Sequence, residues 1–233
     1  MRAALPGNEA ARLDALRRYD ILDSAPETVF DDLTRLASYI GGTPIAAFSL
    51  IDADRQWFKS IVGLDIAETE REAAFCAHAI LAAGVVEVPD ATKDARFADN
   101  RLVLTDPNIR FYAGAPVCTP DGFNLGTICV IDRVPHPGLT SAQREALEAL
   151  SRQAAMLLEL RRTTRELASV LRDLRALSAL LPICSHCRRI RDEASNWKSA
   201  EEALQASGAK LSHSLCPDCL RQHYPEYVDI LKP

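Results

Sequence analysis

Four cysteines near the carboxyl-terminal end are arranged in two Cys-x-x-Cys pairs. The first pair lies in LLPICSHCRRIRD and the second in SHSLCPDCL, with residues 188–215 between them. Two thiolates at this spacing can bind one metal ion, because the turn between them points both sulfurs inward. Two such pairs supply the four soft ligands of a tetrahedral zinc site. The spacing therefore predicts one structural Zn²⁺ per chain, bound by Cys184, Cys187, Cys216 and Cys219.

The segment that carries these pairs has few large apolar residues, and a core this small usually depends on a metal for stability. His213 lies three residues before Cys216 and is an alternative ligand. The three arginines after the first pair either offset the negative charge of a zinc–thiolate centre or form a binding surface. A redox device, in which each pair closes to a disulfide, remains an alternative to zinc.

Composition and charge place the chain among ordinary globular proteins. Of its 233 residues, 48% are hydrophobic and 25% are charged, and the formal net charge of −5 does not favour nucleic acid. The first twenty residues lack the apolar core of a signal peptide, and no run has the length of a membrane span. We therefore expect a cytoplasmic protein that binds neither nucleic acid nor membrane, with its seven cysteines reduced.

The first 140 residues predict an α+β domain. NEAARLDALRRYDIL and APETVFDDLTRLASYIGG have apolar residues at helical spacing. PIAAFSLID, QWFKSIVG and VVEVPD are short apolar or alternating runs, which is typical of strands. FYAGAPVCTPDGFNLGTICVID predicts a hairpin that turns at residues 120–122. Between the strands, FCAHAILAAG predicts a helix of about two turns, and residues 94–108 predict a loop with short helical pieces.

Residues 141–181 predict one long helix, because they contain neither glycine nor proline. Thr140 and Gln143 have the spacing of a capping box at its start. Leucines recur every seven residues at 160, 167, 174 and 181, and residues 163, 170 and 177 occupy the positions three further on. This is the a/d seam of a coiled coil. The seam either pairs with a second chain, which predicts a homodimer, or packs on the chain's own domain.

Five stretches that occur in the same order resemble a GAF domain over about residues 8–160. They are residues 8–40, SLIDADRQWFKSIVGL, FCAHAI, VPDATKDARFADN and the hairpin quoted above. The subgroup they resemble occurs at the front of bacterial sensor kinases and diguanylate cyclases. The resemblance implies an antiparallel sheet with helices on one face and a small-molecule pocket on the other. It also implies that the terminal helices pair in a dimer.

The pocket implied by this resemblance has several candidate ligand-binding residues. The Asn-Lys-x-x-Phe-Asp-Glu motif of members that bind cyclic nucleotides does not occur. Bilin-binding members attach their chromophore to a cysteine directly before a histidine, whereas here Ala77 separates the two. The identity of the ligand therefore stays open, and each candidate also has a structural explanation as core or turn residue. The candidates are Trp57, Cys76, His78, Asp90, Arg96, Phe97 and Tyr112.

Free methionine sulfoxide reductases are GAF domains that use cysteine chemistry, and they provide the alternative to a sensor. This domain has Cys76, Cys118 and Cys129, and Cys76 begins a predicted helix, where a thiol pKa can be lowered. The cysteine-bearing loop of that family is replaced by FADNRLVLTDPNIR, which has no cysteine. We therefore predict that the chain is not an enzyme, with a thiol reductase or a redox switch as alternatives.

The tail resembles a short segment that follows GAF or receiver domains in bacterial signalling proteins. The match covers residues 181–192, Trp197, residues 212–219 and the Tyr224-Pro225 pair. Together, these observations predict three parts: a GAF sensor domain (1–140), a long dimerisation helix (141–181) and a zinc-ribbon-like cysteine module (182–233). The GAF domain would sense a small molecule or a redox state and relay it to a module that binds an unknown signalling protein.

Overall fold

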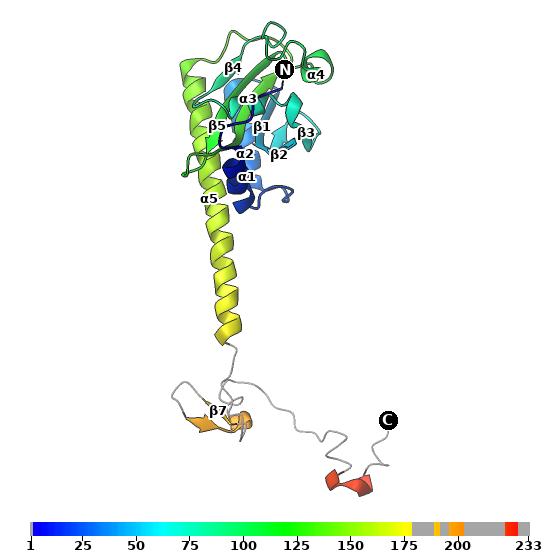
Figure 1. Cartoon of the computed structure of the whole chain (residues 1–233), viewed down its shortest axis with the longest axis vertical. Helices are drawn as coiled ribbons and strands as arrows, with labels where there is room; N and C mark the ends of the chain where they lie inside the picture. Colours follow the sequence, from blue (N-terminus) through cyan, green and yellow to red (C-terminus); the bar gives the residue numbers. More distant parts are fainter. Residues whose placement is uncertain (1, 179–188, 192–195, 203–221, 228–233) are drawn as a thin grey trace. The chain divides into compact units, whose positions relative to one another are not determined.

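The computed structural model describes residues 2–178, 189–191, 196–202 and 222–227 (Figure 1). The four predicted zinc ligands and His213 lie outside these ranges, so the predicted metal site is not tested. The chain divides into two compact units, Met1–Ala168 and Ser169–Pro233.

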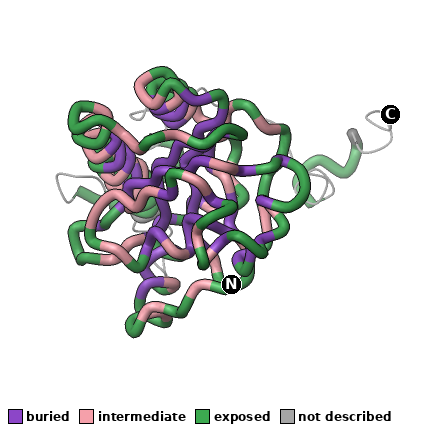
Figure 2. Tube along the Cα trace, turned by 90° about the horizontal axis from the view of Figure 1, so that it is seen from above, coloured by how far each residue is buried: buried purple, intermediate pink, exposed green. Residues whose placement is uncertain are grey.

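A six-stranded antiparallel sheet forms the centre of the first unit. Its strands are β1 (Ile45–Ile51), β2 (Arg55–Val62), β3 (Glu68–Glu70), β4 (Val86–Val88), β5 (Phe111–Cys118) and β6 (Asn124–Asp132). Their order is β3-β2-β1-β6-β5-β4, so the first strand of the domain pairs with the last. The two central strands, β1 and β6, are almost entirely buried (Figure 2). The predicted hairpin is confirmed as the β5–β6 pair.

Three helices cover one face of this sheet: α1 (Glu9–Arg18), α2 (Thr28–Gly41) and α5 (Ser141–Ser178). The other face carries the 3₁₀ helix η1 (Arg71–Ala73), the short helices α3 (Phe75–Ala79) and α4 (Arg101–Leu104), and the segments that connect them. The predicted helix after residue 75 is shorter than expected, because the backbone turns at residues 80–84 and leads into β4. The predicted α+β fold with an antiparallel sheet is confirmed.

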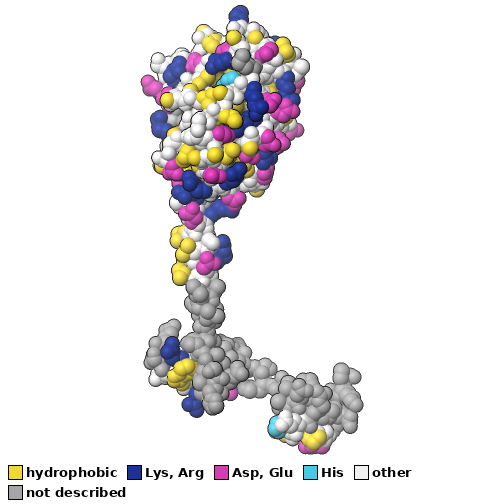
Figure 3. Space-filling model, in the orientation of Figure 1, with side chains coloured by type: hydrophobic (Ala, Val, Ile, Leu, Met, Phe, Trp, Pro, Cys, Tyr) yellow, Lys and Arg dark blue, Asp and Glu magenta, His cyan; other side chains and the backbone are white. Residues whose placement is uncertain are grey.

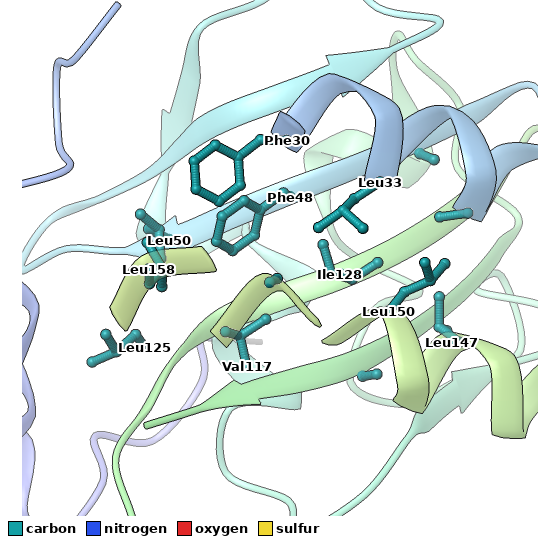
Figure 4. Packing of buried hydrophobic residues seen from close by; sticks show 14 of the residues in the cluster. Phe30, Leu33, Phe48, Leu50, Val117, Leu125, Ile128, Leu147, Leu150 and Leu158 are labelled. Carbon is teal, nitrogen blue, oxygen red and sulfur yellow. The ribbon is translucent and has the colours of Figure 1, made fainter. Parts of the chain in front are cut away.

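Each face of the sheet has its own hydrophobic core, because side chains alternate between the faces along a strand. On the helix side, Phe48 and Ile128 of the sheet contact Phe30 and Leu33 of α2 and Leu150 of α5 (Figure 4). On the opposite side, Ala47 and Cys129 of the sheet belong to a second cluster with Phe75 and Ala79 of α3.

The ends of the helices follow local sequence signals. Gly42 adopts φ 64°, the left-handed conformation that glycine accepts readily, and it ends α2. The predicted capping box is confirmed: Gln143 N donates to Thr140 Oγ1 at 3.3 Å, and Thr140 N donates to Gln143 Oε1 at 2.9 Å. The long helix is confirmed to Ser178, but the structure of one chain does not test its pairing with another.

In the second unit, the described ranges contain the end of α5 and short elements only. β7 (Ile190–Arg191) pairs with β8 (Trp197–Lys198), and η2 spans Pro225–Tyr227. Among the described helices, none combines the length and the apolar character that a membrane crossing requires.

Candidate functional site

A small cavity lies on the face of the sheet opposite α1, α2 and α5. It has a volume of about 30 Å³ and a largely apolar wall. The strands contribute Phe58 and Ile131 to this wall, helix α4 contributes Leu102, and the segment between β2 and β3 contributes Leu64 and Ile66. Ile66 is 39% exposed, so the wall of the cavity reaches the surface of the domain. Four polar side chains also line it: Gln56, Thr69, Cys76 and Tyr112.

Two buried oxygen atoms in this wall have no hydrogen-bond partner among the residues that the structure describes. They are Gln56 Oε1 and Thr69 Oγ1. Gln56 of β2 and Thr69 of β3 are directly opposite each other in the strand pairing, so both side chains project to the same face. A buried polar group without a partner costs about 1–3 kcal/mol. A small molecule that donates hydrogen bonds to these oxygens would therefore be stabilised in the cavity.

Two cysteines meet at the cavity. Cys76 lies in the first turn of α3 and Cys129 lies in the central strand β6, and their sulfur atoms are 3.7 Å apart. Both side chains are buried, with exposed fractions of 1% and 0%. The sulfur of Cys129 therefore lies within hydrogen-bond distance of Cys76.

Tyr112 completes this thiol site. Its hydroxyl donates a hydrogen bond to Cys76 Sγ at 3.4 Å, and its side chain is fully buried. The ring crosses over Gly114, two residues further along the same face of β5. A Cβ atom at position 114 would lie only 2.1 Å from the Tyr112 hydroxyl oxygen. Glycine at this position therefore leaves the space that the tyrosine occupies.

The surroundings affect the two thiols in opposite directions. Burial opposes ionisation of Cys76, but hydrogen bonding with Cys129, Ser49, Thr127 and Tyr112 outweighs burial and lowers its pKa. The hydrogen bond with Cys76, together with burial, raises the pKa of Cys129. Burial and the nearby sulfurs also raise the pKa of Tyr112 well above its usual value, so this residue remains a donor. The site therefore favours one thiolate, on Cys76, beside one protonated thiol.

An aromatic cluster lies beside the cavity. Phe75 stacks on Phe97 with ring centroids 3.9 Å apart, and His78 contacts the edge of Phe97 at 4.8 Å. The Arg96 guanidinium lies 5.1 Å from the centre of the same ring and pairs with Asp94. Three of the predicted ligand-binding residues, His78, Arg96 and Phe97, are thus brought together, while Cys76 and Tyr112 line the cavity itself.

The remaining two predicted residues lie elsewhere. Trp57 belongs to the helix-side core, because residues 56 and 58 of β2 face the cavity and residue 57 faces the other way. Asp90 stands in a turn, where its carboxylate accepts hydrogen bonds from Thr92 and pairs with the exposed Lys93. Gln56 and Thr69 were not predicted, since the sequence alone does not show which residues of a strand face a cavity.

A second concavity lies between the end of β5 and α5 in the first unit. Its volume is about 490 Å³, and it is lined mainly by Pro116, Cys118, Pro120, Ala155 and Met156. Cys118 is exposed. Partial burial of its sulfur atom nevertheless raises the pKa of the thiol. Among the hydrogen bonds of the described residues, the Cys118 thiol donates to the carbonyl of Thr119 at 3.5 Å.

Comparisons with known proteins agree with this architecture. The family model described as the GAF domain matches residues 25–158. A curated relative, a cyclic di-GMP phosphodiesterase of Pseudomonas aeruginosa, is 45% identical over 147 residues, which are 63% of this chain and 25% of the relative. The chain therefore spans about a quarter of that relative's length.

Solved structures of GAF domains are similar to this chain at low sequence identity. The blue-light absorbing form of the PixJ GAF domain of Thermosynechococcus elongatus has a TM-score of 0.50 at 13% identity, covering 73% of this chain and 98% of that one. The GAF domain of an Acinetobacter phosphoenolpyruvate-protein phosphotransferase has a TM-score of 0.48 at 17% identity, covering 67% and 98%.

One prediction from the sequence is contradicted by these comparisons. We predicted that the chain is not an enzyme, but the relative that is 45% identical bears the name of an enzyme. The argument from the cysteines against catalysis considered thiol chemistry alone and did not test other kinds of reaction.

Proposed function

Because this chain belongs to the GAF domain family, we propose that its first unit is a sensory domain that controls the turnover of cyclic di-GMP. The support is the 45% identity to a cyclic di-GMP phosphodiesterase over the region that contains the GAF match. Identity at this level over 147 residues favours a shared signalling role. In this proposal, whether a small molecule occupies the cavity determines the rate at which cyclic di-GMP is hydrolysed.

The observation that carries the sensory role is the pair of unpartnered oxygens in the cavity. Gln56 Oε1 and Thr69 Oγ1 are buried in a mostly apolar wall and are directly opposite each other. Such an arrangement provides both apolar contact and specific hydrogen bonds for a small molecule. Binding there would stabilise one conformation of α3 and α4 over another, which is the requirement for a ligand to shift an equilibrium.

We further propose that α5 transmits the signal as part of a homodimer. Leu160 and Leu167, two predicted seam residues, are 61% and 60% exposed, and Met156 on the preceding turn is 64% exposed. Figure 3 shows hydrophobic side chains along one side of this helix. An apolar stripe that its own domain leaves exposed is typical of a coiled-coil surface that pairs with a second copy.

The carboxyl-terminal module completes the proposal. A Zn²⁺ ion held by Cys184, Cys187, Cys216 and Cys219 would give residues 182–233 a defined surface for a signalling partner. His213 stays an alternative ligand. The chemistry that zinc would supply here is structural, since four thiolates leave no open coordination position.

The test of the sensory role is the level of cyclic di-GMP in a bacterial host that expresses the full chain and a fluorescent reporter. We expect the wild-type chain to lower this level relative to an empty vector. The Gln56→Leu/Thr69→Val variant, which removes both cavity oxygens at nearly constant volume, should shift the level away from that of wild type.

Lys93→Gln is the matched control, because Lys93 is 82% exposed and lies outside the cavity. It should behave as wild type. An unchanged reporter with the wild-type chain would refute a role in cyclic di-GMP turnover. Identical effects of the wild-type chain and the cavity variant would refute the assignment of the sensory site.

A further inference from the structure

We propose that Cys76 and Cys129 form a peroxide-reactive dithiol, in which a small hydroperoxide enters the cavity and the two thiols close to a disulfide. This deepens the proposed sensory function and rests on it for its biological meaning, while the chemistry can be tested by itself. The reactive pair is distinct from the Cys-x-x-Cys pairs near the carboxyl terminus.

The positions of the two sulfurs favour this reaction. They are 3.7 Å apart in the reduced protein, and a disulfide requires about 2.05 Å. Cys129 belongs to a central strand that is bonded on both sides, whereas Cys76 belongs to a helix of only five residues. A shift of α3 toward the sheet would therefore bring the sulfurs together without a change in the sheet.

The cavity provides access to one of the two sulfurs. Cys76 lines the cavity wall, as does the exposed Ile66 at its outer end, while Cys129 lies behind Cys76 in the core. A volume of about 30 Å³ accommodates roughly two water molecules at ~10–15 Å³ each. Hydrogen peroxide has about this size. The cavity therefore favours hydrogen peroxide over bulky organic hydroperoxides and over methionine sulfoxide.

The unpartnered oxygens suit the same molecule. Hydrogen peroxide has two O–H donors, and Gln56 Oε1 and Thr69 Oγ1 are two buried atoms that can accept them. A molecule that donates to both oxygens gives each of these buried groups the hydrogen-bond partner that it lacks. The wall thus offers a place to hold the peroxide next to the sulfur that it oxidises.

The reaction has two steps. The Cys76 thiolate attacks one peroxide oxygen, the O–O bond breaks, and the other oxygen leaves as water after taking up a proton, so that Cys76 becomes a sulfenic acid. The Cys129 sulfur then attacks the Cys76 sulfur, the S–O bond breaks, and a second water leaves. In total, two thiols and one hydrogen peroxide give one disulfide and two waters. The thiols are oxidised and the peroxide is reduced.

Closure of the disulfide would reach the segment that covers the cavity. Asn100 Nδ2 donates to the carbonyl of Ala73, three residues before Cys76, at 3.0 Å. Phe75, the residue before Cys76, stacks on Phe97. A displacement of α3 therefore changes both contacts with residues 97–104, and this provides the link between oxidation and the conformation of the domain.

The test uses the reduced full chain, treated with hydrogen peroxide and then with a thiol-alkylating reagent, and analysed by peptide mass mapping. We expect a Cys76–Cys129 disulfide to form about tenfold faster than Cys118 is modified, because the thiolate is the reactive form and is favoured at Cys76. The mapping separates this pair from the four tail cysteines. Cumene hydroperoxide and methionine sulfoxide should react far more slowly than hydrogen peroxide.

Two variants assign the roles of the sulfurs. Cys129→Ser should accumulate a sulfenic acid on Cys76 that a dimedone probe traps, and Cys76→Ser should leave Cys129 unmodified. The wild-type mapping is decisive even if a variant fails to fold. Modification of Cys118 before Cys76, or equal rates with small and bulky hydroperoxides, would overturn the proposal. Disulfide formation without any effect on the cyclic di-GMP reporter would instead refute the link between this oxidation and cyclic di-GMP turnover and leave the peroxide chemistry standing.

Discussion

Tyr112 is the residue whose contacts most directly control the thiol chemistry. Its hydroxyl donates to Cys76 Sγ, and the hydrogen bond stabilises the thiolate more than the thiol. The same contact depends on Gly114, since any larger residue at that position would occupy the place of the hydroxyl group. Tyr112 and Gly114, which are not oxidised themselves, thus determine the ionisation state of Cys76, which is.

Tyr112→Phe should raise the pKa of Cys76. One lost hydrogen bond is worth about 1 kcal/mol, which corresponds to about a fivefold smaller thiolate population at pH values well below the pKa. The pKa of the wild-type thiol is lowered to about 6, so the rate of Cys76–Cys129 disulfide formation should fall as the pH decreases through this value. In the variant, the midpoint of this pH profile should move to higher pH.

Gly114→Ala tests the same contact from the opposite side. Its Cβ would displace the Tyr112 ring, so the profile should shift as in Tyr112→Phe, with an additional loss of about 1–3 kcal/mol of unfolding free energy from overpacking. Chemical denaturation measures that loss. A profile that neither substitution moves would show that the tyrosine does not influence the thiol.

At the scale of elements, a cluster of charged side chains connects α1 to η1, the 3₁₀ helix that precedes α3. The Glu9 carboxylate accepts hydrogen bonds from Arg12 within α1 and from Arg71 in η1. Arg12 and Arg71 are buried, with exposed fractions of 1% and 6%. Burial opposes ionisation of Glu9, but the two arginines outweigh it and lower its pKa to about 2. The N-terminal helix is therefore held partly by charge.

This cluster predicts a specific loss of stability in acid. The pKa of Glu9 is lowered in the folded state from 4.5 to about 2, so its contribution is fully present above pH 4.5. It should be lost as the pH falls from 4.5 to about 2, by roughly 3 kcal/mol of unfolding free energy at most. Glu9→Gln should lower the stability at pH 7 and flatten the pH dependence in this range.

Glu72→Gln is the control for this experiment. Glu72 also pairs with an arginine, Arg2, but both side chains are more than half exposed, at 63% and 60%. We expect it to change stability by less than about 1 kcal/mol. Denaturant unfolding at several pH values compares the variants. Equal acid sensitivity of wild type and Glu9→Gln would contradict the assignment.

The exposed leucines of α5 lead to a prediction about assembly. Leu160→Lys/Leu167→Lys should convert a dimer into a monomer in analytical ultracentrifugation, because two charges would enter an apolar seam. The fold of the first unit should persist, since both side chains are more than half exposed. Ser169→Lys adds charge at a position outside the a/d seam and should remain dimeric. A monomeric wild-type chain would contradict the seam.

Sequence reasoning succeeded for elements that depend on neighbours in the chain. The capping box of Thr140 and Gln143, the stop at Gly42 and the β5–β6 hairpin all arise within a few residues of each other. The cavity depends instead on pairing at long range. Cys76 and Cys129 are 53 positions apart, and their contact requires that β6 lie next to β1 beneath α3.

The choice of Trp57 rather than Gln56 has a similar cause. In a strand, adjacent residues face opposite sides, so an error of one position exchanges a cavity residue for a core residue. The pairing of β1 with β2 also contains an irregularity between Phe48 and Ser49, which shifts the register of one strand against the other. Neither the face nor this shift can be deduced from the hydrophobic pattern of one strand.

At the scale of the whole molecule, six of the seven cysteines divide into two chemical groups. In the first unit, Cys76 and Cys129 lie in a dense core and their sulfurs are held by the sheet and α3. In the predicted tail module, few large apolar residues are available, so a metal rather than packing would provide the stability. The two groups should therefore differ in their response to chelators and oxidants.

The metal prediction concerns the complete chain and can be measured directly. Tag-free protein purified under reducing conditions should contain about one zinc per chain, as expected for four thiolate ligands in one tetrahedral site. Cys184→Ser/Cys187→Ser should lose this zinc, because two ligands cannot hold it against competition from buffer and solvent. Cys118→Ser removes an exposed cysteine of the first unit and should retain it. Since the metal stabilises only the tail, the thermal unfolding of the first unit should be the same in all three proteins. Zinc that persists in the double variant would assign the metal to other ligands, and wild-type protein without metal would leave the tail cysteines as a redox device.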